Sequence, residues 1–227
     1  MRRIFAISDI HVDFKENREF VNSWSHDKYG EDVLILAGDV TDCTSLLKET
    51  LQHLSKTFYK VFYVSGNHEL WIRRPEEFAD SIVKFHEIIS LCDTIGVSTR
   101  PEKIQVTDND SVHFVPRQDL ILPNGEEKEK LNAECERLGL DVKKNENSKV
   151  NFNFSMYAGC KRIEKQIREI NPIIHVYGHQ HRQRDRKIDG VNYISHCLGY
   201  KKERDAGFMW GINEWNGPKL IWPISSV

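Results

Sequence analysis

The stretch VLILAGDVTD, residues 33–42, decides the fold. Its first half is short, apolar and partly β-branched, which is typical of a strand buried on both faces. Its second half is a polar turn that carries Gly38, Asp39 and Asp42. The same change from apolar to polar occurs after residues 4–7 and after residues 58–64. Segments with helical spacing separate these runs, and this alternation predicts an α/β fold with mostly parallel early strands.

Helical spacing is clearest for the leucines of 46–54 and for the apolar residues of 78–89, which we expect to end near Gly96. A further helix is expected over 157–170, followed by a strand at 173–177. The middle of the chain predicts short strands at 104–106 and 112–115, a turn at 108–110, and an exposed, charge-rich helix from 126 to Gly139. The end of the chain predicts antiparallel strands at 191–197, 208–215 and 220–224.

Composition limits the possible function. The chain has 227 residues with 34 acidic and 32 basic side chains, a formal charge of −2. This balance excludes nucleic-acid binding through bulk positive charge. No apolar run is long enough to span a membrane, and the apolar start is too short for a signal peptide. The five cysteines are scattered and form no C-x-x-C pair. We therefore expect one domain over 1–227, reduced thiols and a cytoplasmic location.

Polar side chains follow each predicted early strand and the strand at 173–177. The four turns are Asp9-Ile10-His11, Gly38-Asp39-Val40-Thr41-Asp42, Gly66-Asn67-His68-Glu69 and Gly178-His179-Gln180-His181. Because the carboxyl ends of parallel strands meet at one edge of a sheet, these turns are expected to converge. The spacing agrees, since 28 residues separate His11 from Asp39 and another 28 separate Asp39 from Asn67.

The residue types in these turns indicate two metal ions. Aspartate, asparagine and several histidines form a mixed oxygen and nitrogen set, which suits Mn²⁺, Fe, Zn²⁺ or Co²⁺ better than Mg²⁺ or Ca²⁺. Six or seven ligands exceed what one ion needs, and a carboxylate such as Asp39 can bridge two ions about 3.5–4 Å apart. Two divalent cations and two aspartates leave a positive site, which attracts an anion. Phosphoester hydrolysis is the expected reaction, with a phosphate-ester substrate.

In this order, the four motifs resemble the calcineurin-like metallophosphoesterase superfamily over roughly residues 4–182. The resemblance implies two face-to-face sheets flanked by helices. It implies that Asp9, His11 and His181 hold one metal, Asp39 bridges, and Asn67 and His179 hold the second with a further histidine. It also implies that His68 protonates the leaving group, that Asp42 orients His68, and that a metal-bound hydroxide attacks a phosphomonoester or phosphodiester.

The sequence departs from the family pattern in two places. The best candidate for the further histidine is His113, which lies only 45 residues after His68, so that a strand or two of the usual fold is expected to be missing. Cys43 stands where related protein phosphatases have an arginine that grips phosphate. Arg117, Arg73 or Arg74 are the candidates to replace it. The alternative to an enzyme is a binding scaffold that keeps the fold and has lost catalysis.

Overall fold

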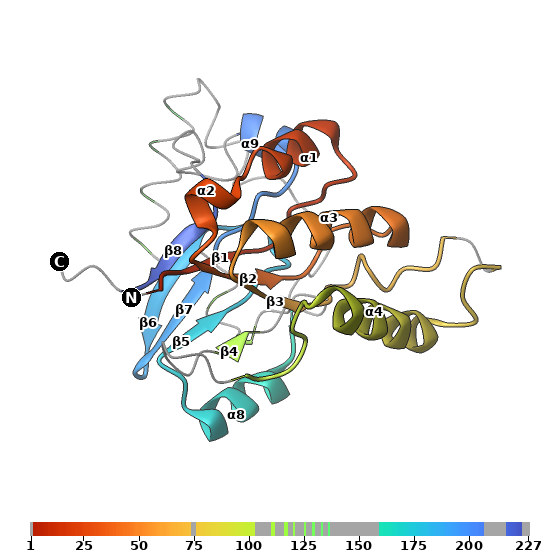
Figure 1. Cartoon of the computed structure of the whole chain (residues 1–227). Helices are drawn as coiled ribbons and strands as arrows, with labels where there is room; N and C mark the ends of the chain where they lie inside the picture. The colour runs from red at the N-terminus through yellow and green to blue at the C-terminus, as the bar shows by residue number, and fades with distance from the viewer. Residues whose placement is uncertain are drawn as a thin grey trace.

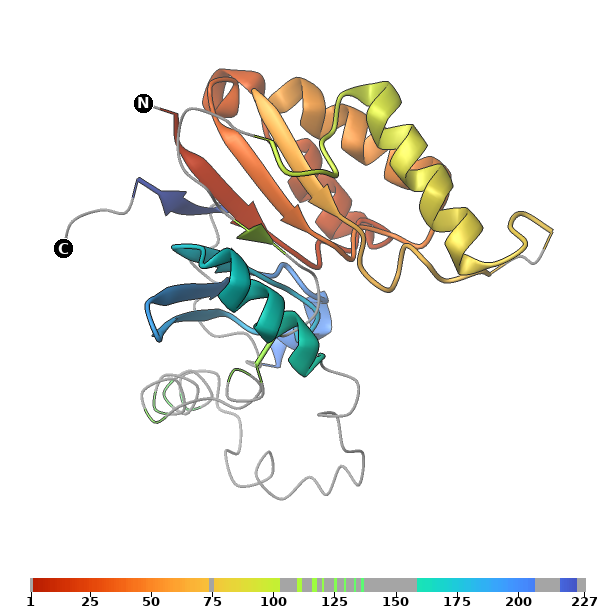
Figure 2. The same cartoon turned by 90° about the horizontal axis from the view of Figure 1, so that it is seen from below.

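The structure is a computed structural model, and it describes residues 2–73, 76–102, 110–111, 116–117, 120, 125, 129, 133, 136, 159–206 and 217–223. Within these residues the chain forms two four-stranded sheets that pack face to face, with helices on both outer sides (Figure 1). Figure 2 shows these layers from below. The predicted two-sheet α/β architecture is therefore confirmed. No helix in the described part of the chain is both long and apolar enough to cross a membrane.

The first sheet contains the three strands that the apolar runs predicted. β1 (Ile4–Ile7), β2 (Val33–Ala37) and β3 (Lys60–Val64) are parallel, and β8 (Lys219–Trp222) pairs antiparallel with β1, so the order is β3-β2-β1-β8. Alternate side chains of a strand face opposite sides of the sheet. Leu34 and Leu36 therefore pack toward the helices, whereas Val33 and Ile35 face the second sheet. This double burial explains the uninterrupted apolar run.

Four helices precede or follow these strands: α1 (Lys15–Asn22), α2 (His26–Tyr29), α3 (Thr44–Thr57) and α4 (Ser81–Ile95). α3 buries Leu47, Leu51 and Leu54 in the core of the first sheet, as their spacing predicted. Gly96 ends α4 in the left-handed conformation, at φ 76°, which agrees with the predicted end of this helix.

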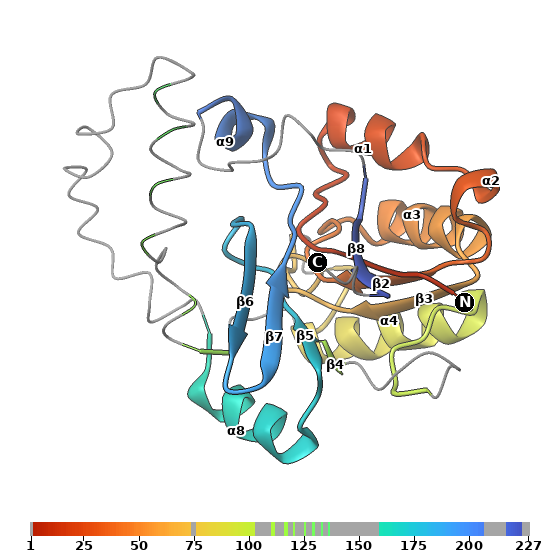
Figure 3. The same cartoon turned by 90° about the vertical axis from the view of Figure 1, so that its left-hand side faces the viewer.

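The second sheet has the order β4-β5-β7-β6, with β4 (Asp110–Ser111), β5 (Ile174–Val176), β6 (Arg184–Ile188) and β7 (Val191–Ser195). α8 (Lys161–Ile170) packs on it through Ile167, against Tyr177 and Tyr193. Figure 3 shows α9 (Lys201–Asp205) and α8 at opposite ends of this sheet. The predicted antiparallel pairing of β7 is confirmed on its β6 side, whereas on its other side β7 runs parallel to β5. The prediction of a turn at 108–110 was wrong for Asp110, which begins β4.

Several predicted elements lie wholly or partly on residues that the structure does not describe. The expected strands at 104–106, 112–115 and 208–215, and the expected loss of a strand in the middle, lie outside the described residues. Of the expected charged helix, Glu129, Ala133 and Glu136 are described, and they are helical and exposed.

The two sheets are joined at the end of β1. The Ser8 amide donates to the His196 carbonyl at 2.9 Å, and the Leu198 amide donates to the Ser8 carbonyl at 3.1 Å. The layer between the sheets is apolar and contains Ile4, Ala6, Val33, Ile35, Ala37, Ile174, Val176, Ile194 and Ile221. These contacts bring the carboxyl end of β1 beside the carboxyl end of β7, so that loops from both sheets meet.

Candidate metal centre

The loops after β1 and β2 continue the pairing of their strands. The Asp9 amide donates to the Gly38 carbonyl at 2.9 Å, and the His11 amide donates to the Asp39 carbonyl at 3.1 Å. The next pair, from the Val12 amide to the Val40 carbonyl, measures 2.9 Å. Asp9, His11 and Asp39 are thereby held side by side at the edge of the first sheet.

The second sheet reaches the same place through the loop after β5. The His179 amide donates to both carboxylate oxygens of Asp9, at 2.9 and 3.1 Å. From the segment after β7, the Gly199 amide donates to the Asp9 carbonyl at 2.9 Å. Asp9 is fully buried, and it follows a strand of the first sheet while accepting hydrogen bonds from two segments of the second.

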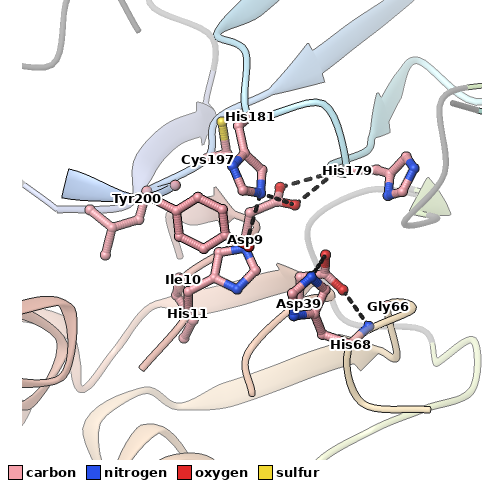
Figure 4. Close-up of polar contacts among 12 residues, drawn as sticks. Asp9, Ile10, His11, Asp39, Gly66, His68, His179, His181, Cys197 and Tyr200 are labelled. Atoms are coloured by element: carbon pink, nitrogen blue, oxygen red, sulfur yellow. Dashed lines mark hydrogen bonds and ion pairs between the residues drawn. The ribbon is translucent and has the colours of Figure 1, made fainter. Parts of the chain in front are cut away.

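Four predicted ligands form one cluster. Each of Asp9, His11, Asp39 and His181 offers a ligand atom, and these four atoms lie within 4.8 Å of one another. The Nε2 atoms of His11 and His181 are 3.0 Å apart, and the Nε2 atom of His181 is 3.5 Å from Oδ1 of Asp9 (Figure 4). All four residues are buried. Two carboxylates and two imidazoles that converge in this way fit one transition-metal ion.

Backbone conformation at these residues is unusual. Asp9, His11, Asp39, His179 and His181 all have positive φ, between 38° and 77°, and they are five of the seven non-glycine residues in the described part of the chain that do. Such conformations cost about 1–3 kcal/mol each and persist where surrounding contacts impose them, often at functional sites. Here the inter-loop hydrogen bonds impose the conformation that turns these side chains toward one point.

Two glycines of the motifs allow the loops to approach the carboxylates. A Cβ atom on Gly178 would lie 2.6 Å from Oδ2 of Asp9, and one on Gly66 would overlap the carboxylate of Asp39. Any larger residue would therefore displace a predicted ligand. This close approach gives a physical reason for glycine at the start of both histidine-containing turns.

Glu69 fastens the loop after β3 to the loop after β2. Its side chain is fully buried and accepts hydrogen bonds from the amides of Asp39, Val40 and Gly66, at 3.2, 2.5 and 2.8 Å. In the same contact region the His68 amide donates to Oδ1 of Asp39 at 3.0 Å. The sequence placed Glu69 in a motif without a role, and the structure shows that it holds the Asp39 backbone in place.

A carboxylate also orients His181. Oε2 of Glu203, from α9, lies 2.7 Å from Nδ1 of His181, which leaves Nε2 directed into the cluster. Burial opposes a charge on His181, but Glu203, Asp9 and Asp39 outweigh it and raise its pKa. Burial likewise opposes the charge of Glu203, and His181 outweighs this and lowers the pKa of that carboxyl. A carboxylate on the remote nitrogen of a ligand histidine is common at metal sites.

His68 lies at the edge of the cluster. Its ring centroid is 4.7 Å from that of His11, and its Nε2 atom is 3.9 Å from Oδ2 of Asp39. The ring of Trp71 lies against it, with the ring centroids 3.8 Å apart. Burial lowers the pKa of His68, although Asp39 and, more weakly, Asp42 act in the other direction.

The structure does not bring the carboxylate of Asp42 to His68. Its Oδ2 atom pairs with Arg73, 2.7 Å from Nε and 2.6 Å from Nη2. The orienting role of Asp42 stays a prediction. Arg73 is thus near the site, whereas Arg117 pairs with Glu164 and Asp189 at the amino end of β7, away from the cluster. Arg74 lies outside the described residues.

The remaining predicted ligands are only partly placed. Asn67 is half-buried between Gly66 and His68, both of which contact Asp39 or its carboxylate. The His179 backbone contacts Asp9, and Figure 4 shows the His179 ring directed away from the Asp9 carboxylate and from the paired rings of His11 and His181. His113 lies outside the described residues. Whether Asn67, His179 and His113 complete a second ion site stays a prediction.

Sequence reasoning missed Glu203 and Tyr200. The Tyr200 ring lies 4.6 Å from that of His11 and 4.7 Å from that of His181, and burial raises its pKa to about 12. Both residues belong to a short charged segment, KKERD, and the tyrosine before it, which resembles an ordinary exposed helix. Only their position after β7 could have signalled a role, because β7 ends at the edge where the ligands gather.

Comparisons with known proteins identify the family. The calcineurin-like phosphoesterase family model matches residues 2–183. Over 98 residues the chain is 35% identical to the acyl-carrier-protein phosphodiesterase PptH of Mycobacterium tuberculosis, a match that covers 42% of this chain and 30% of that protein. The chain thus spans under a third of the length of this curated relative.

Comparison with solved structures found one with a clearly similar fold. The crystal structure of the phosphopantetheinyl hydrolase PptH from Mycobacterium tuberculosis superposes with a TM-score of 0.68 at 22% identity, covering 100% of this chain and 98% of that one. A protein of unknown function, AQ665 from Aquifex aeolicus, has a TM-score of 0.44 at 12% identity, with 87% of this chain and 91% of that chain covered.

Proposed function

The chain belongs to the calcineurin-like phosphoesterase family, and from this premise we propose that it is a metal-dependent hydrolase of phosphoric esters with two divalent ions. The observation that carries the proposal is the cluster of Asp9, His11, Asp39 and His181, whose ligand atoms come from both sheets and lie within 4.8 Å of one another. A binding scaffold has no need of four buried ligand groups held by strained backbone.

We assign the residue roles from the family resemblance. Asp9, His11 and His181 would hold the first ion, Asp39 would be shared, and Asn67, His179 and His113 would hold the second. When bound, the ions supply positive charge that polarises the phosphoryl oxygens and makes water acidic enough to act as the nucleophile. Mn²⁺ is the first metal to test, and Fe, Zn²⁺ and Co²⁺ suit the same donors.

His68 supplies the proton that the leaving group needs. It lies beside the cluster and remains partly accessible, with its side chain 17% exposed. As the bond between phosphorus and the leaving oxygen breaks, the His68 imidazolium donates its proton to that oxygen, so that an alcohol departs. This assistance matters most for poor leaving groups, and general-acid catalysis contributes about 10²–10⁴-fold.

A phosphodiester is the preferred substrate class in this proposal. The relative named above is a phosphodiesterase that acts on acyl carrier protein, and the segment it shares with this chain is 35% identical. The phosphodiester that joins a phosphopantetheinyl group to a carrier protein is therefore one specific substrate to test.

The test begins with protein purified without chelator. We expect two metal ions per chain by elemental analysis, and hydrolysis of bis-p-nitrophenyl phosphate that EDTA abolishes and Mn²⁺ restores. p-Nitrophenyl phosphate and phosphopantetheinyl acyl carrier protein are the other substrates. Asp39→Asn should lose activity and metal, and His113→Ala should lose one ion, whereas His86→Ala, exposed on α4, should change neither.

Two outcomes would contradict the proposal. Folded, metal-loaded protein that hydrolyses none of these esters would favour the scaffold. Activity that survives in Asp39→Asn would show that the cluster is not the reacting site. Unchanged stoichiometry of two ions in His113→Ala would remove His113 from the ligand set while leaving the reaction class intact.

A further inference from the structure

Lys84 is a buried lysine that joins two loops. It lies on α4 with 3% of its surface exposed, and its Nζ atom donates to the Asp42 carbonyl at 2.9 Å and to the Trp71 carbonyl at 2.7 Å. The Phe78 ring lies 5.5 Å from the ammonium. Burial lowers the pKa of Lys84, although Asp42, Glu69 and Glu77 partly offset this. Lysine is rarely buried unless it is paired, so this position requires a reason.

The two carbonyls belong to the two segments that flank His68. Asp42 follows β2, and Trp71 comes three residues after His68 in the loop that follows β3. The Trp71 amide donates to the His68 carbonyl at 3.2 Å, and its ring lies against the His68 ring, tilted by 31°, with the ring centroids 3.8 Å apart. The place of Trp71 therefore determines where the His68 ring can lie.

Arg73 contacts the side chains of both Trp71 and Asp42. Its guanidinium lies 5.1 Å from the centre of the Trp71 ring and pairs with the carboxylate of Asp42. Lys84 holds the backbones of Trp71 and Asp42 from the protein interior, while Arg73 connects their side chains at the surface. The side chain of Arg73 is 64% exposed and that of Lys84 is enclosed, so Lys84 is the more rigid of the two connections.

We infer that Lys84 is a positioning residue for His68, acting through the backbone of Trp71 to hold the imidazole where a leaving group departs. The inference rests on the proposed function, in which His68 protonates the leaving oxygen. In this chain the carboxylate of Asp42 is engaged with Arg73, so the contact of His68 with Trp71 takes over the orienting role. Lys84 touches neither substrate nor the predicted ligands.

The test separates positioning from simple stability. Lys84→Met keeps an unbranched side chain that is one heavy atom shorter, and it removes the ammonium. Activity is measured on diaryl phosphates whose phenols have increasing pKa, from p-nitrophenol to unsubstituted phenol. If the proton donor is displaced, kcat/KM should fall about tenfold or more for diphenyl phosphate and less than about threefold for bis-p-nitrophenyl phosphate, because nitrophenolate leaves without protonation.

Lys48→Met is the matched control, since Lys48 is exposed on α3, and it should leave both rates unchanged. Lys84→Met that lowers all rates by the same factor, or none of them, overturns the inference. Wild-type protein that hydrolyses no ester overturns the proposed function instead, which keeps the two failures distinct.

A second pair of variants covers the case in which Lys84→Met does not fold. Trp71 is 41% exposed, so it can be replaced without a buried cavity. Trp71→Ala should show the same selective loss on diphenyl phosphate, and Trp71→Phe, which keeps a ring against His68, should restore at least half of the wild-type rate. Equal behaviour of the Ala and Phe variants would show that the Trp71 ring does not position His68.

Discussion

Glu203 determines the ring orientation of His181 in the ligand cluster. Its carboxylate lies on Nδ1 of His181 and also accepts the Tyr200 amide at 2.9 Å. With Nδ1 engaged, Nε2 is the atom that remains to face Asp9 and His11. One side chain on α9 thereby fixes the tautomer and the ring direction of a predicted ligand on another loop.

Replacing that carboxylate by an amide should weaken metal binding. We expect Glu203→Gln to lower the affinity for Mn²⁺ about 10–100-fold, because the orienting charge is lost while the shape is kept. Titration of chelator-treated protein by calorimetry measures this. Asp205→Asn, exposed on the same helix, is the control. Equal affinities in the two variants would mean that Glu203 does not act on the ion.

At the scale of single residues, the sequence predicted the metal ligands better than the side chains that hold those ligands in place. Asp9, His11, Asp39 and His181 could be predicted because each follows directly after a strand or its turn, and the structure brings them together. Glu203 could not, since it reaches His181 through the folding of α9 across the site. Asn17 shows the same limit: it is buried on polar α1, where its amide donates to the carbonyls of Ile10 and Gly199.

At the scale of elements, α4 depends on Asp80, the N-cap residue directly before it. The Asp80 side chain accepts hydrogen bonds from the amides of Ile82 and Val83, both at 2.8 Å, and so satisfies two donors that the helix itself leaves unpaired. This cap fixes where the helix begins, and Lys84 lies in its first turns.

Removing the cap should cost about 1 kcal/mol of unfolding free energy, within a range of about 0.5–2. Asp80→Ala is the variant, and chemical denaturation followed by circular dichroism measures the loss. Asp93→Ala is the matched control, because Asp93 lies on the same helix in an exposed ion pair with Arg100, and such pairs contribute little. If both variants lose the same free energy, the cap adds nothing specific.

Elements with strong apolar patterning were predicted, and polar ones were not. β1, β2, β3, α3 and α4 follow from runs or spacing of large apolar residues. No pattern predicted α1, which buries only Asn17 and Val21. β6 was not predicted either. In its sequence RDRKI, more buried positions alternate with exposed ones, but most of these positions carry charged side chains. Such segments are ordered by tertiary contacts, which a local pattern does not contain.

At the scale of the whole molecule, metal binding should stabilise the fold. Ligands come from both sheets, and an ion that binds only the folded state adds about 2.7 kcal/mol when present at 100 times its Kd. For a domain of this size we expect Mn²⁺ to raise Tm by roughly 5–10 °C and EDTA to reverse the rise. Asp27→Asn, exposed on α2, should keep the shift and Asp39→Asn should lose it. A shift that survives in Asp39→Asn would place the stabilising ion elsewhere.

Stability should also depend on pH through His196. Burial, with Lys219, lowers the pKa of His196 to about 4, and a hydrogen bond with the Gly217 carbonyl acts in the other direction. Between its unfolded value of about 6.5 and about 4, the unfolded chain binds more protons, so stability falls as the pH falls, by up to about 3 kcal/mol. Denaturation at a series of pH values measures this.

The matched variants for this measurement are His196→Gln and His86→Gln. The first removes the buried imidazole and should flatten the dependence between pH 6.5 and 4. The second removes an exposed imidazole on α4 and serves as the control for the loss of one histidine. Identical slopes for wild type and His196→Gln would assign the acid sensitivity to other groups.

The overall arrangement was predicted from two sources. Apolar runs predicted parallel strands and helices, but they carry no information on how a second sheet stacks on the first. The two-sheet architecture came from the resemblance of the motifs, and the layer of Ile35, Ile174 and Val176 between the sheets confirms it. The described cysteines are all free thiols, as expected, while a cytoplasmic location stays a prediction.

Because Asp9, His11 and Asp39 follow strands of the first sheet and His181 follows β5 of the second, the apolar layer between the sheets sets how these ligand groups are aligned. An enlarged or shrunken side chain at Ile35 or Val176 should shift His181 relative to Asp9, His11 and Asp39, although neither residue belongs to the ligand cluster. Substitutions in this layer should therefore abolish activity before they prevent folding. Random mutagenesis scored for both activity and folding should find folded but inactive variants there.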